Sequence, residues 1–117
     1  MKNEFGVTLE KGYAPSIVPG HGTYACWACG KNGTGDPMNR HEIFGGPFRE
    51  KSKRLGLWVH LCHNRCHQGP HGVHNNRGMD LRLKREGQRA AQETYHWTVE
   101  DFIREFGKNY EREEEAS

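Results

Sequence analysis

The sequence is poor in apolar residues and contains no long apolar run. Hydrophobic residues make up 33% of the 117 positions, and no stretch approaches the roughly 20 apolar residues that a membrane-spanning helix needs. The length allows one domain, and the low apolar share together with 15 glycines leaves little surface to bury in a core. We therefore expect a small soluble domain that needs a further source of stability, such as a bound metal ion.

The sequence also lacks a strong net charge, internal repeats and any segment that resembles a signal peptide. A formal net charge of +2 does not by itself indicate a nucleic-acid partner. The charges are unevenly distributed, however, because two segments are basic and the C-terminal end is acidic. The basic residues are Arg49, Lys51, Lys53 and Arg54 in segment 49–54, and Arg77, Arg82, Lys84, Arg85 and Arg89 in segment 77–89.

The four cysteines form two pairs that are far apart in the sequence. Cys26 and Cys29 enclose two residues, whereas Cys62 and Cys66 enclose three. Short spacing within a pair lets one turn present two sulfurs to a single ion, and the long gap then ties two distant segments together. The pattern predicts a structural Zn²⁺ held by all four cysteines. The wider second gap leaves His67 as an alternative to Cys66 for the fourth ligand.

Two disulfides are the other explanation of these four residues. A two-residue gap is unfavourable for a bridge within a pair, and nothing in the sequence resembles a secretory signal. Reduced thiols are the normal state inside cells, where disulfides are rare. We therefore expect free thiols, bound zinc and a cytoplasmic location.

Alternation and turn residues divide the middle of the chain into two strands, a loop and a short helix. Residues 41–44 are predicted to form the first strand, and residues 57–61 the second, because apolar side chains alternate along it. A Gly-Gly-Pro sequence prevents a regular continuation of the first strand, which leaves the basic segment 49–54 on an exposed loop. A short helix over residues 62–68 is expected to end at a Gly-Pro pair.

Helix signals continue after this region. Residues 81–95 are rich in good helix formers, and Asp80 is the expected N-terminal cap. Thr98 is a second candidate cap, followed by apolar residues at helical spacing and by Gly107 as a stop signal. We expect this second apolar stripe to pack in the core.

The same signals divide the chain into three parts. Residues 1–22 combine glycine and proline with short apolar pieces and predict an irregular N-terminal arm. Residues 23–107 are expected to form one domain that includes the C-terminal helices. Residues 108–117 are expected to form a frayed acidic tail.

The order of motifs resembles small phage and prophage HNH endonucleases, also called His-Me finger endonucleases. The shared order is His-Glu-Ile-Phe-Gly-Gly from His41, a basic segment, an apolar strand ending in Leu-Cys, a Cys-His pair, and Gly-Val-His-x-Asn from Gly72. The likeness covers residues 24–92, in particular to the branch associated with phage recombination, near a RecA-dependent nuclease family. It implies a small α+β fold, a zinc-stapled ββα-metal finger with additional C-terminal helices.

This resemblance implies hydrolysis of DNA with Mg²⁺ or Mn²⁺. Such chemistry needs a group that activates water and a divalent cation that holds the scissile phosphate. His41 stands where the family has the opening His of its triad. Many HNH proteins have Asp-His or His-His here, whereas this chain has His41-Glu42. Two assignments stay open: His41 binds the metal and Glu42 is the base, or His41 is the base and the metal relies on later residues.

The resemblance also implies that His67 and His74 bind the catalytic metal. His67 follows the last cysteine as in Cys-His motifs, and His74 belongs to the Gly-Val-His-x-Asn element. His71 has no equally clear counterpart and is explained as readily by an exposed loop position. Where the family often has an Asn in the loop, this chain has Phe48, so the role of that Asn must be filled differently.

DNA contacts are expected from the basic segments. Charged side chains that contact phosphates fix the register of a nucleic acid rather than read its sequence. Arg49, Lys51, Lys53 and Arg54 are therefore predicted to bind DNA without sequence preference. The basic helix that follows has two interpretations, a second phosphate contact or a solvated face.

We conclude from the sequence that this is a metal-dependent HNH endonuclease of phage or prophage type, acting in the cytoplasm of a bacterial host. The expected partners are DNA and a recombination, replication or packaging protein of the phage, and no membrane contact is expected. Two alternatives remain. One is a catalytically inactive zinc-binding module for DNA, which Glu42 and Phe48 favour, and the other is an RNA-binding zinc knuckle.

Overall fold

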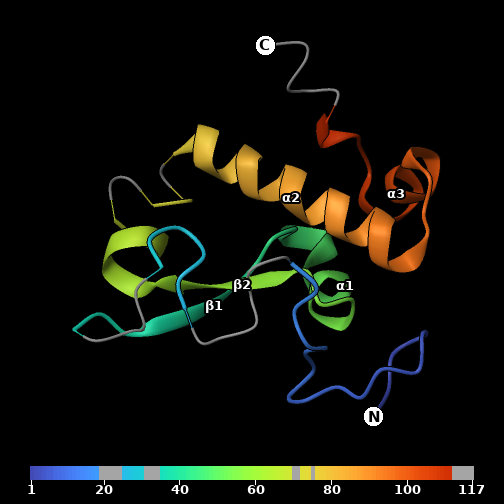
Figure 1. Cartoon of the computed structure of the whole chain (residues 1–117), viewed down its shortest axis with the longest axis horizontal. Coiled ribbons are helices and arrows are strands. Elements are labelled where there is room, and N and C mark those ends of the chain that lie inside the picture. Colours follow the sequence, from blue (N-terminus) through green and yellow to red (C-terminus); the bar gives the residue numbers. More distant parts are fainter. Residues whose placement is uncertain (19–24, 31–34, 70–71, 75, 112–117) are drawn as a thin grey trace.

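The computed structural model describes residues 1–18, 25–30, 35–69, 72–74 and 76–111. Its elements follow in the order β1 (Met38–Glu42), η1 (Gly46–Phe48), α1 (Arg49–Arg54), β2 (Trp58–Cys62), η2 (His63–His67), α2 (Arg77–Tyr95) and α3 (Val99–Phe106). Here η1 is a 3-10 turn and η2 is a π-helical turn. The predicted fold class is confirmed: a small α+β domain with a β-hairpin, clustered cysteines and C-terminal helices (Figure 1). No helix in the described ranges is long and apolar enough to cross a membrane.

The hairpin is antiparallel, with Met38 opposite Cys62 and His41 opposite Val59. The predicted bounds of the first strand were wrong, because it begins at Met38 and ends before the apolar pair Ile43 and Phe44. That pair is 1% exposed and belongs to the hydrophobic core. Because successive side chains of a strand point to opposite faces, His41 lies on one face of β1, and Arg40 and Glu42 lie on the other.

The basic segment after the hairpin's first strand forms helix α1, so the predicted exposed loop was wrong in conformation. Pro47 lies in the first turn of η1, where its missing N–H costs nothing, and α1 follows at once. The buried Ser52 Oγ donates a 2.6 Å hydrogen bond to the carbonyl of Leu57. This bond and the burial of Leu55 fold the segment back onto the start of β2.

Helix α2 starts at Arg77, three residues before its predicted cap. Asn76 is the N-cap, and its side-chain oxygen accepts a 3.0 Å hydrogen bond from the backbone N–H of Met79. Asp80 was therefore wrong as the cap, and it lies in the first turn of the helix. The predicted bounds of α3 are confirmed, since Thr98 forms a capping box with Asp101 and Gly107 ends the helix at φ 89°.

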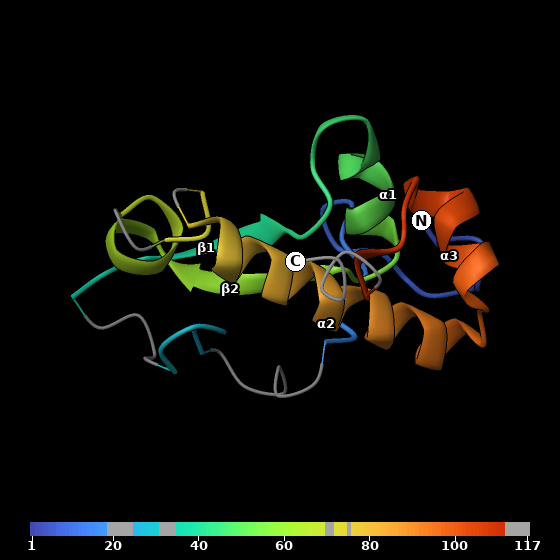
Figure 2. The ribbon, with the colours of Figure 1, turned by 90° about the horizontal axis from the view of Figure 1, so that it is seen from above.

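Helix α2 covers the hairpin when the molecule is seen from above (Figure 2). Gly87 permits this packing, because a Cβ there would lie 3.2 Å from side-chain atoms of Ile43 and Phe44. The Phe44 ring in turn contacts Phe102 and Phe106 of α3, with ring centroids 5.5 and 4.6 Å apart. The core thus lies where α2, α3 and the end of β1 meet.

Residues 1–18 lie on the side of the hairpin away from α2 (Figure 1). They are fixed by hydrogen bonds from Asn3 Nδ2 to the carbonyl of Arg54 and from Trp58 Nε1 to the carbonyl of Ala14, both 2.7 Å long. The Phe5 ring also stacks on Tyr95. The predicted N-terminal arm and acidic tail each extend beyond the described residues, at 19–22 and 112–117.

Candidate metal centres

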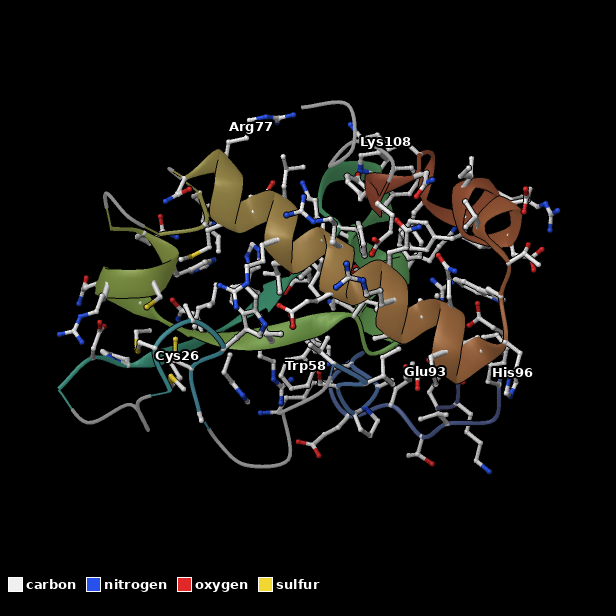
Figure 3. The ribbon with its side chains drawn as sticks, turned by 45° about the horizontal axis from the view of Figure 1, so that its top comes forward. Cys26, Trp58, Arg77, Glu93, His96 and Lys108 are labelled. Atoms are coloured by element: carbon white, nitrogen blue, oxygen red, sulfur yellow. The ribbon has the colours of Figure 1, made fainter. Side chains whose placement is uncertain are left out.

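The four cysteines converge at the end of the hairpin that is next to η2. Each offers one sulfur, and the four sulfurs lie within 4.8 Å of one another. Figure 3 shows sulfur atoms gathered around Cys26. The segment that contains Cys26 packs beside β2, where the N–H of Trp27 donates a 2.8 Å hydrogen bond to the carbonyl of His60. All four thiols are free, and Cys29 is the exposed member. No disulfide links them, in agreement with the sequence prediction.

This arrangement fits a tetrahedral zinc site. Zn–S bonds of about 2.3 Å at tetrahedral angles place sulfurs about 3.8 Å apart, and the sulfurs of Cys29 and Cys62 are 3.6 Å apart. Cys66 lies with the other cysteines while His67 lies with two histidines, so their positions favour Cys66 over His67 as the fourth ligand. We call these four residues the cysteine quartet.

Protonation of the quartet is uneven. Burial raises the pKa of Cys62 to about 12 and also raises that of Cys66. Burial opposes ionisation of Cys26 too, but backbone N–H groups of Cys29, Cys62 and Ala28 outweigh it and lower the pKa of Cys26 to about 7. A zinc ion binding here must displace protons from the buried thiols, so its affinity rises with pH.

Three histidines form a second cluster, which we call the histidine trio: His41, His67 and His74. His67 Nε2 lies 3.2 Å from His41 Nδ1 and 2.9 Å from His74 Nε2. His41 is buried, His67 is half-buried and His74 is exposed. One nitrogen from each ring thus faces a common point that is open on one side, which suits a metal ion with free coordination positions.

Burial keeps His41 and His67 neutral. It lowers the pKa of His41 to about 3, with smaller contributions from the charges of His67, His74 and Lys84. Burial and the nearby His74 and His63 also lower the pKa of His67. Neutral imidazole is the form that binds metals, so His41 and His67 are ready to act as ligands at neutral pH. His41 Nε2 is buried without a hydrogen-bond partner among the described residues.

Asn39 orients His67, a role that the sequence prediction missed. Its side-chain oxygen lies 3.2 Å from His67 Nδ1 and 2.6 Å from His63 Nδ1. Because a carbonyl oxygen only accepts, it fixes the proton of His67 on Nδ1 and leaves the Nε2 lone pair facing the cluster. Asn39 lies on the same face of β1 as His41, so a prediction that placed the start of the strand correctly would have put Asn39 next to the histidines.

Glu42 lies in the same cleft, held by two donors. Tyr13 donates a 2.7 Å hydrogen bond to Oε2, and Arg49 Nε lies 2.7 Å from Oε1. Burial, followed by the hydrogen bond to Glu42, raises the pKa of Tyr13 to about 12, so the phenol stays protonated as a donor. Tyr13 was also missed, because it comes from the irregular N-terminal segment, where no periodic pattern exists.

These residues line an open cleft of about 590 Å³. The histidine trio and Glu42 lie in it, and three cationic side chains also line it: Arg40, Arg49 and Lys84. Lys84 pairs with Asp80 at 2.9 Å. The carboxylates of Glu42 and Asp80 also line the cleft, so it has a small excess of positive charge beside a candidate metal site. This charge suits a phosphate-containing ligand.

The four residues predicted to bind DNA all form ion pairs within the chain. The partners are Glu42 for Arg49, Glu105 for Lys51, Glu50 for Lys53 and Glu4 for Arg54, at distances of 2.7, 3.1, 3.4 and 3.4 Å. Of these cations only Arg49 lines the cleft. Their contact with DNA stays a prediction.

Phe48, which stands in place of the family's Asn, lies away from this chemistry. Its ring contacts Phe106 at a centroid distance of 5.8 Å. His63 is tied to Asn39 beside the trio, whereas His71 lies outside the described residues. Asn76, part of the Gly-Val-His-x-Asn element, caps α2 and so fixes the start of that helix at Arg77, three residues after His74.

The hairpin, the quartet, the trio and the helix that follows make an arrangement consistent with a ββα-metal finger. Comparisons with known protein families, with characterised proteins and with solved structures found no significant match to this chain.

Proposed function

We propose that this protein is a metal-dependent endonuclease of the HNH type that hydrolyses phosphodiester bonds in DNA. The observation that carries the proposal is the histidine trio in a cationic cleft, next to a closed cysteine quartet. A cleft with metal ligands and cations has the groups needed to bind a phosphodiester and to cleave it.

The geometry supports the assignment in which His41 is a ligand and Glu42 is the base. His41 Nδ1 faces the other two imidazoles and points toward the same centre as their nitrogens. Glu42 is the cleft carboxylate that adjoins His41 in the chain, and Tyr13 and Arg49 fix its position. In this proposal Glu42 accepts the proton of the attacking water, while Arg49 and Lys84 contact the phosphate oxygens.

The donor set also indicates which ion is bound. A divalent ion held by the trio would supply Lewis-acid chemistry to the scissile phosphate. Three imidazole nitrogens suit transition-metal ions, whereas Mg²⁺ prefers oxygen ligands. Of the two ions expected from the sequence, Mn²⁺ therefore fits the described ligands better than Mg²⁺.

A plasmid-nicking assay tests the proposal. The zinc-loaded protein should nick supercoiled DNA with Mn²⁺, more slowly with Mg²⁺, and not after the added ion is removed. His74→Ala is a suitable negative control, because His74 is exposed and lies outside the cysteine quartet. Retarded migration of DNA without nicking, under every ion tried, would favour the non-catalytic DNA-binding module instead. Co-purification from infected cells would test the predicted phage partner.

A further inference from the structure

Arg40 has an unusual position among the cations of the cleft. It precedes His41 in β1 and projects to the opposite face of the strand. Its guanidinium carbon lies 4.6 Å from the centroid of the Tyr13 ring and 5.1 Å from that of Trp58. Arg49 and Lys84 each pair with a carboxylate, but the Arg40 side chain has no ion pair with any described residue. Its charge is available to a ligand.

A second hollow of about 290 Å³ begins where Arg40 lies. Arg40 and Tyr13 line both this hollow and the larger cleft, so the two adjoin. Trp58 and Pro15 supply apolar walls to the second hollow, and Glu10 supplies a polar group. Trp58 is on the side of the hairpin that faces the N-terminal segment (Figure 3), where its Nε1 is bound to the carbonyl of residue 14.

The chemistry of this hollow suits a nucleotide. A planar guanidinium binds a phosphate through two parallel hydrogen bonds, and two aromatic rings already hold that of Arg40 in place. Aromatic and apolar walls suit the face of a base. A nucleic-acid strand carries one phosphate per nucleotide, so a strand whose scissile phosphate lies at the histidine trio has further phosphates close by.

We infer that Arg40 and the second hollow form a subsite for the nucleotide next to the scissile phosphate on the cleaved strand. Arg40 binds its phosphate, and the walls formed by Tyr13 and Trp58 receive its sugar and base. This subsite rests on the proposed nuclease function and makes Arg40 a positioning residue for that reaction. It also assigns the N-terminal segment a part in binding substrate, because Tyr13 belongs to it.

The test pairs Arg40→Gln with substrates in which single phosphates are replaced by uncharged methylphosphonates. On unmodified DNA we expect Arg40→Gln to lower kcat/KM about ten- to hundredfold, the range for losing hydrogen bonds to a charged group. In the wild type, one methylphosphonate next to the cleavage point should cause a similar loss. The two losses should not multiply in the variant, because both remove the same contact.

Arg82→Gln is the matched control. Arg82 is also an arginine over an aromatic ring, with its guanidinium carbon 5.6 Å from the centroid of Trp27, but it lines neither hollow. Its loss should multiply with that of the methylphosphonate. Arg40→Lys keeps the charge and should recover part of the activity. If Arg40 only packed the two aromatic rings, the loss in Arg40→Gln would not depend on which phosphate is replaced by a methylphosphonate. Zinc content and circular dichroism verify that each variant is folded.

The outcomes separate this inference from the proposed function. Suppose that the wild type nicks DNA, but that the loss from Arg40→Gln multiplies with the loss from a methylphosphonate at every position. This result would overturn the subsite and leave the nuclease assignment standing. Absence of nicking by the wild type with every ion would overturn both.

Discussion

The cysteine quartet and the histidine trio share the turn η2, which supplies Cys66 to one and His67 to the other, yet they differ in closure. The quartet supplies four thiols, three of them buried, and so fills a tetrahedral site. The trio supplies three imidazoles and opens into a cleft. Structural zinc sites use four protein ligands, while catalytic sites keep a position free for water or substrate. The comparison teaches that ligand number and access, rather than distance along the chain, distinguish the two centres.

Breaking the quartet should have the largest effect. Cys62→Ser removes a buried sulfur that ties β2 to the segment holding Cys26 and Cys29. Structural zinc contributes roughly 10 kcal/mol or more of apparent binding free energy in small domains, and this core is small, so the domain should unfold. Circular dichroism and metal analysis measure this, with about one zinc per chain expected in the wild type. A folded wild-type protein that holds no zinc would contradict the prediction.

Breaking the trio should abolish cleavage without unfolding the domain. His41→Ala removes a ligand that is not part of the quartet, so zinc content and circular dichroism should match the wild type while nicking falls to background. Titration with Mn²⁺ separates the two roles of His41: a ligand role predicts weakened binding, and a base role predicts binding near the wild-type value. Full activity of His41→Ala, in a preparation free of contaminating nuclease, would exclude His41 and the histidine trio as the catalytic centre.

Changing Glu42 sharpens the comparison, because this residue lies in the cleft but in neither centre. If it is the base, Glu42→Gln should lower kcat about 10²- to 10⁴-fold. Tyr13→Phe removes only the 2.7 Å hydrogen bond to Glu42 and should cost about tenfold or less. Equal effects of the two changes would mean that Glu42 positions other groups and that the base is elsewhere. Single-turnover cleavage rates distinguish these results.

The smallest expected effect concerns pH. The pKa of His41 is about 3 in the folded protein, below its ordinary value of 6.5. Between these values the unfolded chain binds more protons than the folded one, so the free energy of unfolding should decrease as pH falls from about 6.5 toward 3. Urea titrations from pH 7 to pH 5, with about one zinc per chain so that only the quartet is filled, should show a shallower slope in His41→Gln than in the wild type.

The control for this measurement is His96→Asn. His96 is exposed, outside both centres, and has a left-handed backbone that Asn tolerates. This change should leave the slope as in the wild type. The wild type, His41→Gln and His96→Asn all contain the quartet, so the contribution of its protonation to the slope cancels when the three are compared. A slope that is identical in wild type and His41→Gln would contradict the lowered pKa.

Much of this architecture could be predicted because its signals are local. The spacing of the cysteine pairs predicted that they would lie together, and Thr98 and Gly107 predicted the ends of α3. The first strand was misplaced because Ile43 and Phe44 have the composition of a strand, whereas packing under α2 at Gly87 takes them into the core. That error concealed Asn39, whose alternation with His41 is visible only when the strand begins at Met38.

The remaining differences are tertiary in origin. Segment 49–54 follows a Gly-Gly-Pro break that predicts a loop, but hydrogen bonds of Ser52 and burial of Leu55 make a short helix stable there. Tyr13 reaches Glu42 across the fold from a segment without periodicity. No local pattern encodes such a contact, so sequence analysis had no signal from which to predict it.

Cys66 and His67 are consecutive residues of the single π-helical turn η2, and they face different centres. A turn whose conformation is fixed by zinc at Cys66 presents His67 in one orientation, which lowers the entropy lost when a second ion binds there. Two ions bound in this way would be thermodynamically linked, and by reciprocity each would raise the affinity of the protein for the other. We therefore expect positive cooperativity between unlike metals as a consequence of the one turn that serves both centres.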